Sequence, residues 1–197
     1  MSSMKPCLRN AMLLGTLALG LMATAAQASA PYHEQRRELM VLLNAYEFRV
    51  DVAVLERIGP EVPKLLIEIS STTRQRPTVR NHALMALSVF PSEQTRKYLE
   101  SLLMERSLKG SPTGTLLRRQ ALRSLGRAFG DRVVVPIANL KDDPDPQIRI
   151  AVAQALGDTG SPRAQSILAA WLPHEKDLAV REAVDHALEH IRRKPGR

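Results

Sequence analysis

The sequence contains very few cysteine and aromatic residues, and it is short of acidic residues. Its 197 residues include one cysteine, one tryptophan, three tyrosines and three phenylalanines. A single cysteine excludes a disulfide framework and a thiolate metal cluster, and so few rings disfavour a protein that stacks nucleic-acid bases. Lysines and arginines number 28 against 20 aspartates and glutamates, a net charge of +8. The apolar fraction of 44% is enough for about one folded domain.

The first thirty residues have the three-part pattern of a secretory signal peptide. Lys5 and Arg9 form a short positive start, residues 11–23 form an uncharged apolar core, and small residues follow. The core is shorter than the roughly 20 residues that span a bilayer, and an uncleaved membrane anchor is the alternative. We expect cleavage after Ala28, so that Cys7 leaves with the signal peptide.

This pattern sets the expected domain organisation and location. We divide the chain into a signal peptide (1–28), a helical-repeat domain (29–191) and a basic C-terminal tail (192–197). The mature chain then has no cysteine, which suits an oxidising compartment, and no transmembrane span. We expect a protein that is secreted across the inner membrane and resides in the periplasm.

Five related segments follow one another after the signal peptide. Four of them begin with an aliphatic residue and an arginine, continue with small apolar residues, and have a leucine seven places after the arginine. The steps between successive arginines are 38, 31 and 32 residues, and Asp51 takes the arginine position in the first segment, 29 residues before Arg80. Such spacing is typical of repeats built from two helices. The segments are residues 50–59, 79–88, 117–126, 148–157 and 180–189.

The apolar residues of each segment recur at helical spacing, and a second helical pattern precedes each segment. Gly59-Pro60 and Gly160-Ser161-Pro162 end one helix and begin the next, since glycine suits a helix C-terminus and proline a first turn. No stretch alternates long enough to predict a strand. We therefore predict an all-α fold of about five helix pairs. The preceding helices are expected at residues 34–46, 61–71, 92–106, 131–140 and 162–171.

Residues 140–164 (LKDDPDPQIRIAVAQALGDTGSPRA) carry a family resemblance. An acidic, proline-containing loop, an aliphatic-Arg pair, an alanine-rich helix and a Leu-Gly end resemble the HEAT repeat, in particular the short HEAT-like type of phycobilisome lyases. The other segments resemble it less closely. The resemblance implies a right-handed α-solenoid whose second helices line the concave side. Members of the family are mostly protein-interaction scaffolds, some attach chromophores, and a related helical-repeat fold serves DNA glycosylases, so the fold alone does not fix the function.

The arginines that begin the segments are candidates for a row of ligand-binding groups. We instead interpret them as a structural ladder, because each stands at the same place just inside a second helix. There a guanidinium can bind loop carbonyls and an acidic residue such as Asp145, and so join neighbouring repeats. The ladder arginines are Arg80, Arg118, Arg149 and Arg181.

Positive charge is concentrated in the middle of the chain. Residues 70–130 contain 11 basic and 3 acidic residues, whereas residues 31–69 and 131–191 each have more acidic than basic residues. A banded positive surface of this kind can concentrate the electric field on an acidic partner. A merely solvated face of an arginine-rich chain is the alternative.

Three arginines and two loops make up this basic centre. Arg119, Arg123 and Arg127 recur every four residues and so share one helix face. The step of 38 residues implies about seven extra residues within 107–115, and insertions in a solenoid fall in loops on one face, which is often the binding face. We predict partner binding by Arg74, Arg76, Lys109, Arg119, Arg123 and Arg127, hereafter the basic centre.

Catalytic groups are not assembled in this sequence. His186 to His190 spell H-x-x-E-H, a metalloprotease pattern, but Ala187 and Leu188 within it are core positions of the repeat. Too little chain follows to supply the distal glutamate ligand. We expect no metal, no cofactor and no enzymatic activity.

These observations favour a non-catalytic scaffold in the periplasm that binds an acidic protein or peptide through its concave face and basic centre. Binding of an anionic polymer, such as an envelope glycan or nucleic acid, is the alternative, with a lyase-type or glycosylase-type enzyme less favoured. Export counts against nucleic acid. The sequence identifies neither the partner nor the oligomeric state.

Overall fold

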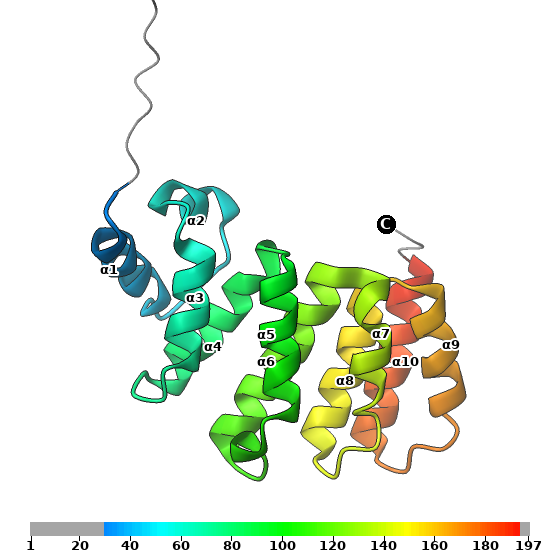
Figure 1. Ribbon diagram of the computed structural model, residues 1–197. Coiled ribbons are helices and arrows are strands. Elements are labelled where there is room, and N and C mark those ends of the chain that lie inside the picture. Colours follow the sequence, from blue (N-terminus) through cyan, green and yellow to red (C-terminus); the bar gives the residue numbers. More distant parts are fainter. Residues whose placement is uncertain (1–29, 194–197) are drawn as a thin grey trace, which may run out of the picture.

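The computed structural model describes residues 30–193, which form ten α-helices, three short 3-10 helices and no β-strand. The α-helices stack in chain order as five pairs (Figure 1). The predicted all-α solenoid of five helix pairs is therefore confirmed. The helices are α1 (Tyr32–Leu43), α2 (Val52–Ile58), α3 (Val62–Ser71), α4 (Pro77–Ala86), α5 (Glu93–Met104), α6 (Pro112–Phe129), α7 (Val134–Ala138), α8 (Pro146–Thr159), α9 (Pro162–Trp171) and α10 (Leu178–Arg193).

The predicted signal peptide and residues 194–197 of the basic tail lie outside the described residues. Within residues 30–193, no helix has the length and apolarity needed to cross a membrane.

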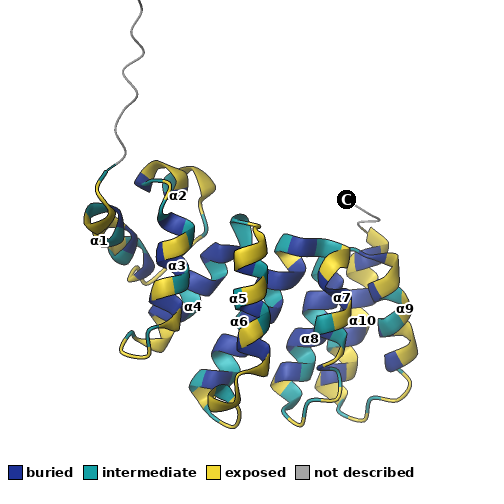
Figure 2. Cartoon of the chain, viewed as in Figure 1, coloured by how far each residue is buried: buried dark blue, intermediate teal, exposed yellow. Residues whose placement is uncertain are grey.

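The second helices of the pairs form the spine of the solenoid. α4 packs on α6, α6 on α8 and α8 on α10, while α3, α5 and α9 pack on their own partners α4, α6 and α10. Leucine, valine, isoleucine and alanine side chains on the facing sides are fully buried, and the outward sides of the helices are exposed (Figure 2). Small residues let the spine helices approach closely: a Cβ on Gly126 would lie 2.3 Å from the backbone oxygen of Ala155.

Local sequence signals determine where most helices begin and end. The Ser92 hydroxyl accepts a hydrogen bond from the amide of Thr95 (3.0 Å) at the start of α5, and Gly160 adopts a left-handed conformation (φ 65°) at the end of α8. The helix expected at residues 131–140 is the exception. It consists of a 3-10 turn and the five-residue α7, because Pro136 has no amide hydrogen to donate to the preceding turn.

The first helix pair departs from the pattern of the others. α2 packs on α1 and α3 and takes no major part in the spine. The end of α1 takes the place beside α4, where the Nδ1 of His82 donates to the backbone oxygen of Leu43 (2.9 Å). Phe48, in the α1–α2 connection, stacks on the His82 ring with centroids 4.8 Å apart. The equivalence of residues 50–59 with the other second helices therefore holds for the sequence pattern and not for the packing.

The connections within the pairs α3–α4, α5–α6, α7–α8 and α9–α10 lie along one edge of the solenoid, the lower edge in Figure 1. We call it the loop edge. The ladder arginines lie at or near the starts of the second helices and therefore close to this edge.

Candidate functional site

Two ladder arginines join neighbouring repeats. Arg118 in α6 donates from Nη2 to Oδ2 of Asp143 (2.6 Å), and both side chains are buried. Arg149 in α8 contacts both carboxylate oxygens of Glu175 (3.0 and 3.1 Å) and also donates from Nη1 to the backbone oxygen of Asp143 (3.0 Å). Each acid belongs to the loop of the next pair, so each contact links one repeat to the following one.

The other two ladder arginines behave differently. Arg80 in α4 is buried and donates from Nε to the backbone oxygen of Ser70 (2.7 Å), so its bond stays within its own pair. Arg181 lies in the first turn of α10, the last described helix, and is exposed. Arginines at the same repeat position therefore differ in their contacts. Two bind the next pair, one binds within its own pair, and one is exposed.

Part of the basic centre lies in a hollow on the spine. Arg123 donates from Nε to Oδ2 of Asp158 (2.9 Å) and from Nη1 to Gln154 (2.8 Å). Arg127 shares the same carboxylate oxygen (3.3 Å). The hollow has a volume of about 400 Å³ and extends over α6, α8 and α10. One carboxylate thus neutralises part of the charge that the sequence concentrates here.

A second part of the basic centre lies at the loop edge. Lys109 and Arg119 line a cavity of about 750 Å³ between the start of α6 and the α7–α8 connection. Lys109, Gly110 and Ser111, within the segment 107–115 that carries the extra residues, form one wall of this cavity.

The two remaining residues of the basic centre lie one repeat away, in the α3–α4 connection. Arg74 and Arg76 are exposed, and Arg76 donates to the side-chain oxygen of Asn44. The six predicted residues therefore lie in three places along the solenoid: at the spine hollow, which Arg123 lines and Arg127 adjoins through Asp158, at the insertion cavity and in the α3–α4 loop.

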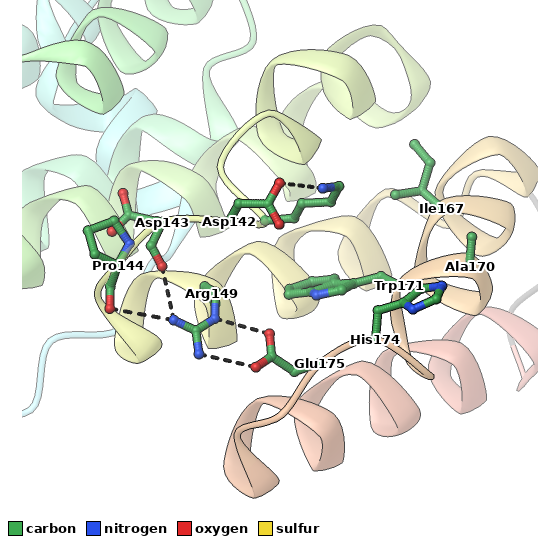
Figure 3. A pocket seen from close by; sticks show the side chains of 10 residues that line it. Asp142, Asp143, Pro144, Arg149, Ile167, Ala170, Trp171, His174 and Glu175 are labelled. Carbon is green, nitrogen blue, oxygen red and sulfur yellow. Dashed lines mark hydrogen bonds and ion pairs between the residues drawn. The ribbon is translucent and has the colours of Figure 1, made fainter.

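A further cavity was not anticipated from the sequence. It has a volume of about 540 Å³ and lies between the α7–α8 connection and α9 (Figure 3). Trp171, Ile167 and Ala170 supply an apolar wall, and Arg149 with Glu175 lies along the rim. Trp171 is buried at the end of α9. The single tryptophan was the one feature of the sequence that pointed to this cavity, because a tryptophan at a helix end can belong to the core or to a binding surface.

The acidic group on this rim is held in its ionised form. Burial by itself raises the pKa of Glu175. Hydrogen bonds from the Arg149 side chain and the Asp177 backbone amide outweigh burial, and the pKa of Glu175 lies below its usual value. The Arg149–Glu175 pair is therefore an ion pair at neutral pH.

The residues of the H-x-x-E-H pattern do not all face the same way. His186 and His190 face the spine hollow with Glu182, whereas Glu189 forms an ion pair with Arg193 (3.1 Å). Among residues 30–193 no three histidine, cysteine, aspartate or glutamate side chains are grouped to hold a metal ion.

The comparisons with known proteins bear on the C-terminal half of the solenoid. No curated protein matches the chain. The family model of HEAT repeats matches residues 113–189, which include α8 and α9 and most of α6 and α10. These are the pairs that carry the inter-repeat arginine contacts. Residues 113–189 thus match HEAT repeats, and residues 30–193 as a whole contain helices and no strand.

Proposed function

We propose that this protein is a non-catalytic interaction scaffold, exported to the periplasm, that binds an acidic protein or peptide through its basic centre. HEAT repeats generally mediate protein binding, and residues 113–189 match them. The export proposal depends on the signal-peptide pattern of residues 1–28.

The observation that carries the acidic-partner proposal is the unequal pairing of charge in the middle of the solenoid. Asp158 is the one carboxylate that pairs with Arg123 and Arg127, and Lys109 and Arg119 form no ion pair with any residue from 30 to 193. On the spine hollow Asp158 and Glu182 outnumber Arg123, whereas on the insertion cavity Lys109, Arg118 and Arg119 outnumber Asp143 and Asp145. An acidic partner therefore meets net attraction at the insertion cavity.

The test is capture of a partner from periplasmic extract. The full-length gene is expressed, and the exported protein is purified from the periplasm as wild type and as the triple variant Arg119→Glu, Arg123→Glu, Arg127→Glu. We expect wild type to retain a discrete protein and the triple variant to lose it. A second triple variant with glutamine at the same positions separates loss of positive charge from repulsion by three new acids.

The matched control reverses three exposed cations outside the basic centre, Arg37, Arg163 and Lys176, and so makes the same change in net charge. This control should retain the partner. Far-ultraviolet circular dichroism should be nearly unchanged in all variants, and capture is measured well below each melting temperature, because the variants of Arg123 and Arg127 lose their bonds to Asp158. Unaltered capture by the Arg119, Arg123, Arg127 variants would overturn the assignment to the basic centre. Retention of only a polyanion, with steep loss at higher salt, would favour the anionic-polymer alternative.

A further inference from the structure

Two cavities lie next to each other on the loop edge, on either side of the α7–α8 connection. The insertion cavity (about 750 Å³) lies between the third and fourth pairs, and the Trp171 cavity (about 540 Å³) lies between the fourth and fifth. Asp143 and Pro144 line both. Each volume falls within the range of roughly 300–1,000 Å³ that is typical of ligand pockets.

The insertion cavity has an excess of positive charge, with Lys109, Arg118 and Arg119 against Asp143 and Asp145. Its two acids have donors at every carboxylate oxygen: Asp143 accepts from Arg118 and the Asp145 amide, and Asp145 accepts from Thr115 and the Gln147 amide. Lys109 and Arg119, by contrast, have no hydrogen-bonded or ionic partner among residues 30–193. The charged side chains that are still free to pair with a ligand in this cavity are therefore both cationic.

The inner wall of the same cavity also has more donors than acceptors. Arg118 lines it, its side chain is 3% exposed, and its Nε is the one buried side-chain polar atom in the described chain without a hydrogen-bond partner. The N-terminus of the 18-residue α6, with its partial positive charge, lies at the same wall. A carboxylate in the cavity supplies negative charge and acceptors that the wall lacks.

The Trp171 cavity has the opposite character. Every carboxylate on its rim is paired: Asp142 with Lys141, Glu175 with Arg149, and Asp143 with Arg118. Between them lies the apolar surface of Trp171, Ile167 and Ala170 (Figure 3). Because the rim carboxylates are already paired and the wall is apolar, this cavity suits an uncharged apolar side chain.

The repeat geometry sets the spacing between the two cavities. They lie at consecutive junctions of the solenoid, and adjacent packed helices have axes roughly 8–10 Å apart. An extended chain covers about 3.3–3.6 Å per residue. One junction therefore corresponds to about three residues of an extended peptide.

From this arrangement we infer that the loop edge binds an extended segment of a partner protein that carries an acidic residue and, about three positions away, an apolar residue. The carboxylate lies in the insertion cavity near Lys109 and Arg119, and the apolar side chain lies against Trp171. This inference rests on the proposed scaffold function and specifies the partner sequence that one part of the basic centre recognises.

The test uses fluorescently labelled ten-residue peptides of serine and glycine that contain one glutamate and one leucine. The two residues are placed one, three or six positions apart, in both orders, and binding to the exported wild-type protein is followed by fluorescence anisotropy. We expect the three-position spacing to bind most tightly in one of the two orders. Replacing the glutamate by glutamine, or the leucine by serine, should each weaken binding by at least about tenfold.

Protein variants locate the two contacts. Lys109→Ala with Arg119→Ala should weaken the glutamate-leucine peptide about tenfold or more, while the glutamine peptide changes little. Ala170→Gln fills the Trp171 cavity from an exposed position and should remove the preference for leucine over serine. The controls are Arg37→Ala with Arg163→Ala, which removes two exposed cations elsewhere, and Ala169→Gln, an exposed neighbour that does not line the cavity.

Equal binding of all spacings, insensitivity to Ala170→Gln, or no binding of any peptide would overturn the inference. The proposed scaffold function fails separately, when reversal of Arg119, Arg123 and Arg127 leaves partner capture unchanged.

Discussion

Between α6 and α10, each second helix packs directly on the next, whereas α2 packs on α1 and α3 and stays outside the spine. In the C-terminal region the loops also bind across repeats, through Arg118 to Asp143 and Arg149 to Glu175. The N-terminal pair is joined to the next by an ion pair between helices, Arg36 to Glu68 (3.4 Å), and not through its ladder position, since Asp51 caps its own helix by accepting from the Val54 amide (3.2 Å). Regular repetition thus accompanies contacts from the ladder position to the next pair, and the first pair, whose ladder position makes no such contact, packs differently.

The glycines that end the repeat pattern show the same difference. Gly126 and Gly157 lie inside α6 and α8 and permit close approach of the next spine helix. Gly59, the residue aligned with them, follows α2 and has a φ of 142°, where a side chain would be strained and would also overlap Gln35. The same glycine position of the repeat therefore allows close helix packing in the C-terminal region and a backbone conformation that disfavours side chains in the N-terminal region.

Surface apolarity follows the same division. Of the seven large hydrophobic residues that are exposed in the described chain, four are Tyr32, Val41, Tyr46 and Val52 of the first pair. Terminal repeats of solenoids lack a neighbour on one side and are commonly atypical. The following predictions test whether inter-repeat contacts are what make the C-terminal region regular.

The largest effect is expected from breaking the buried ion pair between repeats. Arg118→Met leaves Asp143 without its guanidinium and should lower the free energy of unfolding by about 3–5 kcal/mol, as for other buried pairs that lose one partner. Urea denaturation measures this. Arg181→Met, at the same repeat position but exposed, should change stability by less than about 0.5 kcal/mol.

A double variant, Arg118→Met with Asp143→Asn, removes both charges and should recover part of the loss. If the double variant is no more stable than Arg118→Met alone, or if Arg118→Met costs no more than Arg181→Met, the ion pair is not what joins the third and fourth pairs.

A smaller effect is expected from closing the space between spine helices. Gly126→Ala puts a methyl group 2.3 Å from the Ala155 backbone oxygen and should cost about 2 kcal/mol, since overpacking costs roughly 1–3 kcal/mol and alanine favours the helix by up to about 1 kcal/mol. Gly157→Ala, whose closest contact is the Ala187 Cβ at 3.0 Å, should be nearly neutral. Thermal unfolding of the two variants tests this difference. Equal melting temperatures would contradict the interpretation that Gly126 is needed for the close approach of α6 and α8.

The smallest effect is expected from the outer ion pair, and it depends on pH. The folded-state pKa of Glu175 is lowered, so its stabilising contribution is present above the unfolded pKa of about 4.3 and is lost as pH falls through the folded value. Glu175→Gln should therefore lower stability by about 1 kcal/mol at pH 7 and by progressively less below pH of about 4. Melting temperatures of wild type and variant from pH 3 to 7 test this.

Glu189→Gln, which removes an exposed carboxylate from the last helix, is the matched control and should show no such convergence. A stability difference for Glu175→Gln that stays constant across the whole pH range would mean that ionisation of Glu175 does not stabilise the fold.

The candidate site was predictable only in part. The spacing of Arg119, Arg123 and Arg127 places them on one helix face, because helical periodicity is a local property. The spacing could not reveal that Asp158 neutralises part of that face. Asp158 is more than thirty residues from Arg127, and the packing of α6 on α8 brings the two together. Nor could the spacing reveal the Trp171 cavity, whose walls come from α9 and two different loops.

The sequence by itself determined the helix pairs, their number and most of their ends, because apolar spacing, caps, glycines and prolines act within a few residues. Tertiary structure alone decided which ladder arginine meets a carboxylate, which cations keep no partner, and where the first pair packs. These outcomes depend on groups brought together from separate repeats. Identical sequence positions therefore acquire different roles at the middle and at the ends of the solenoid.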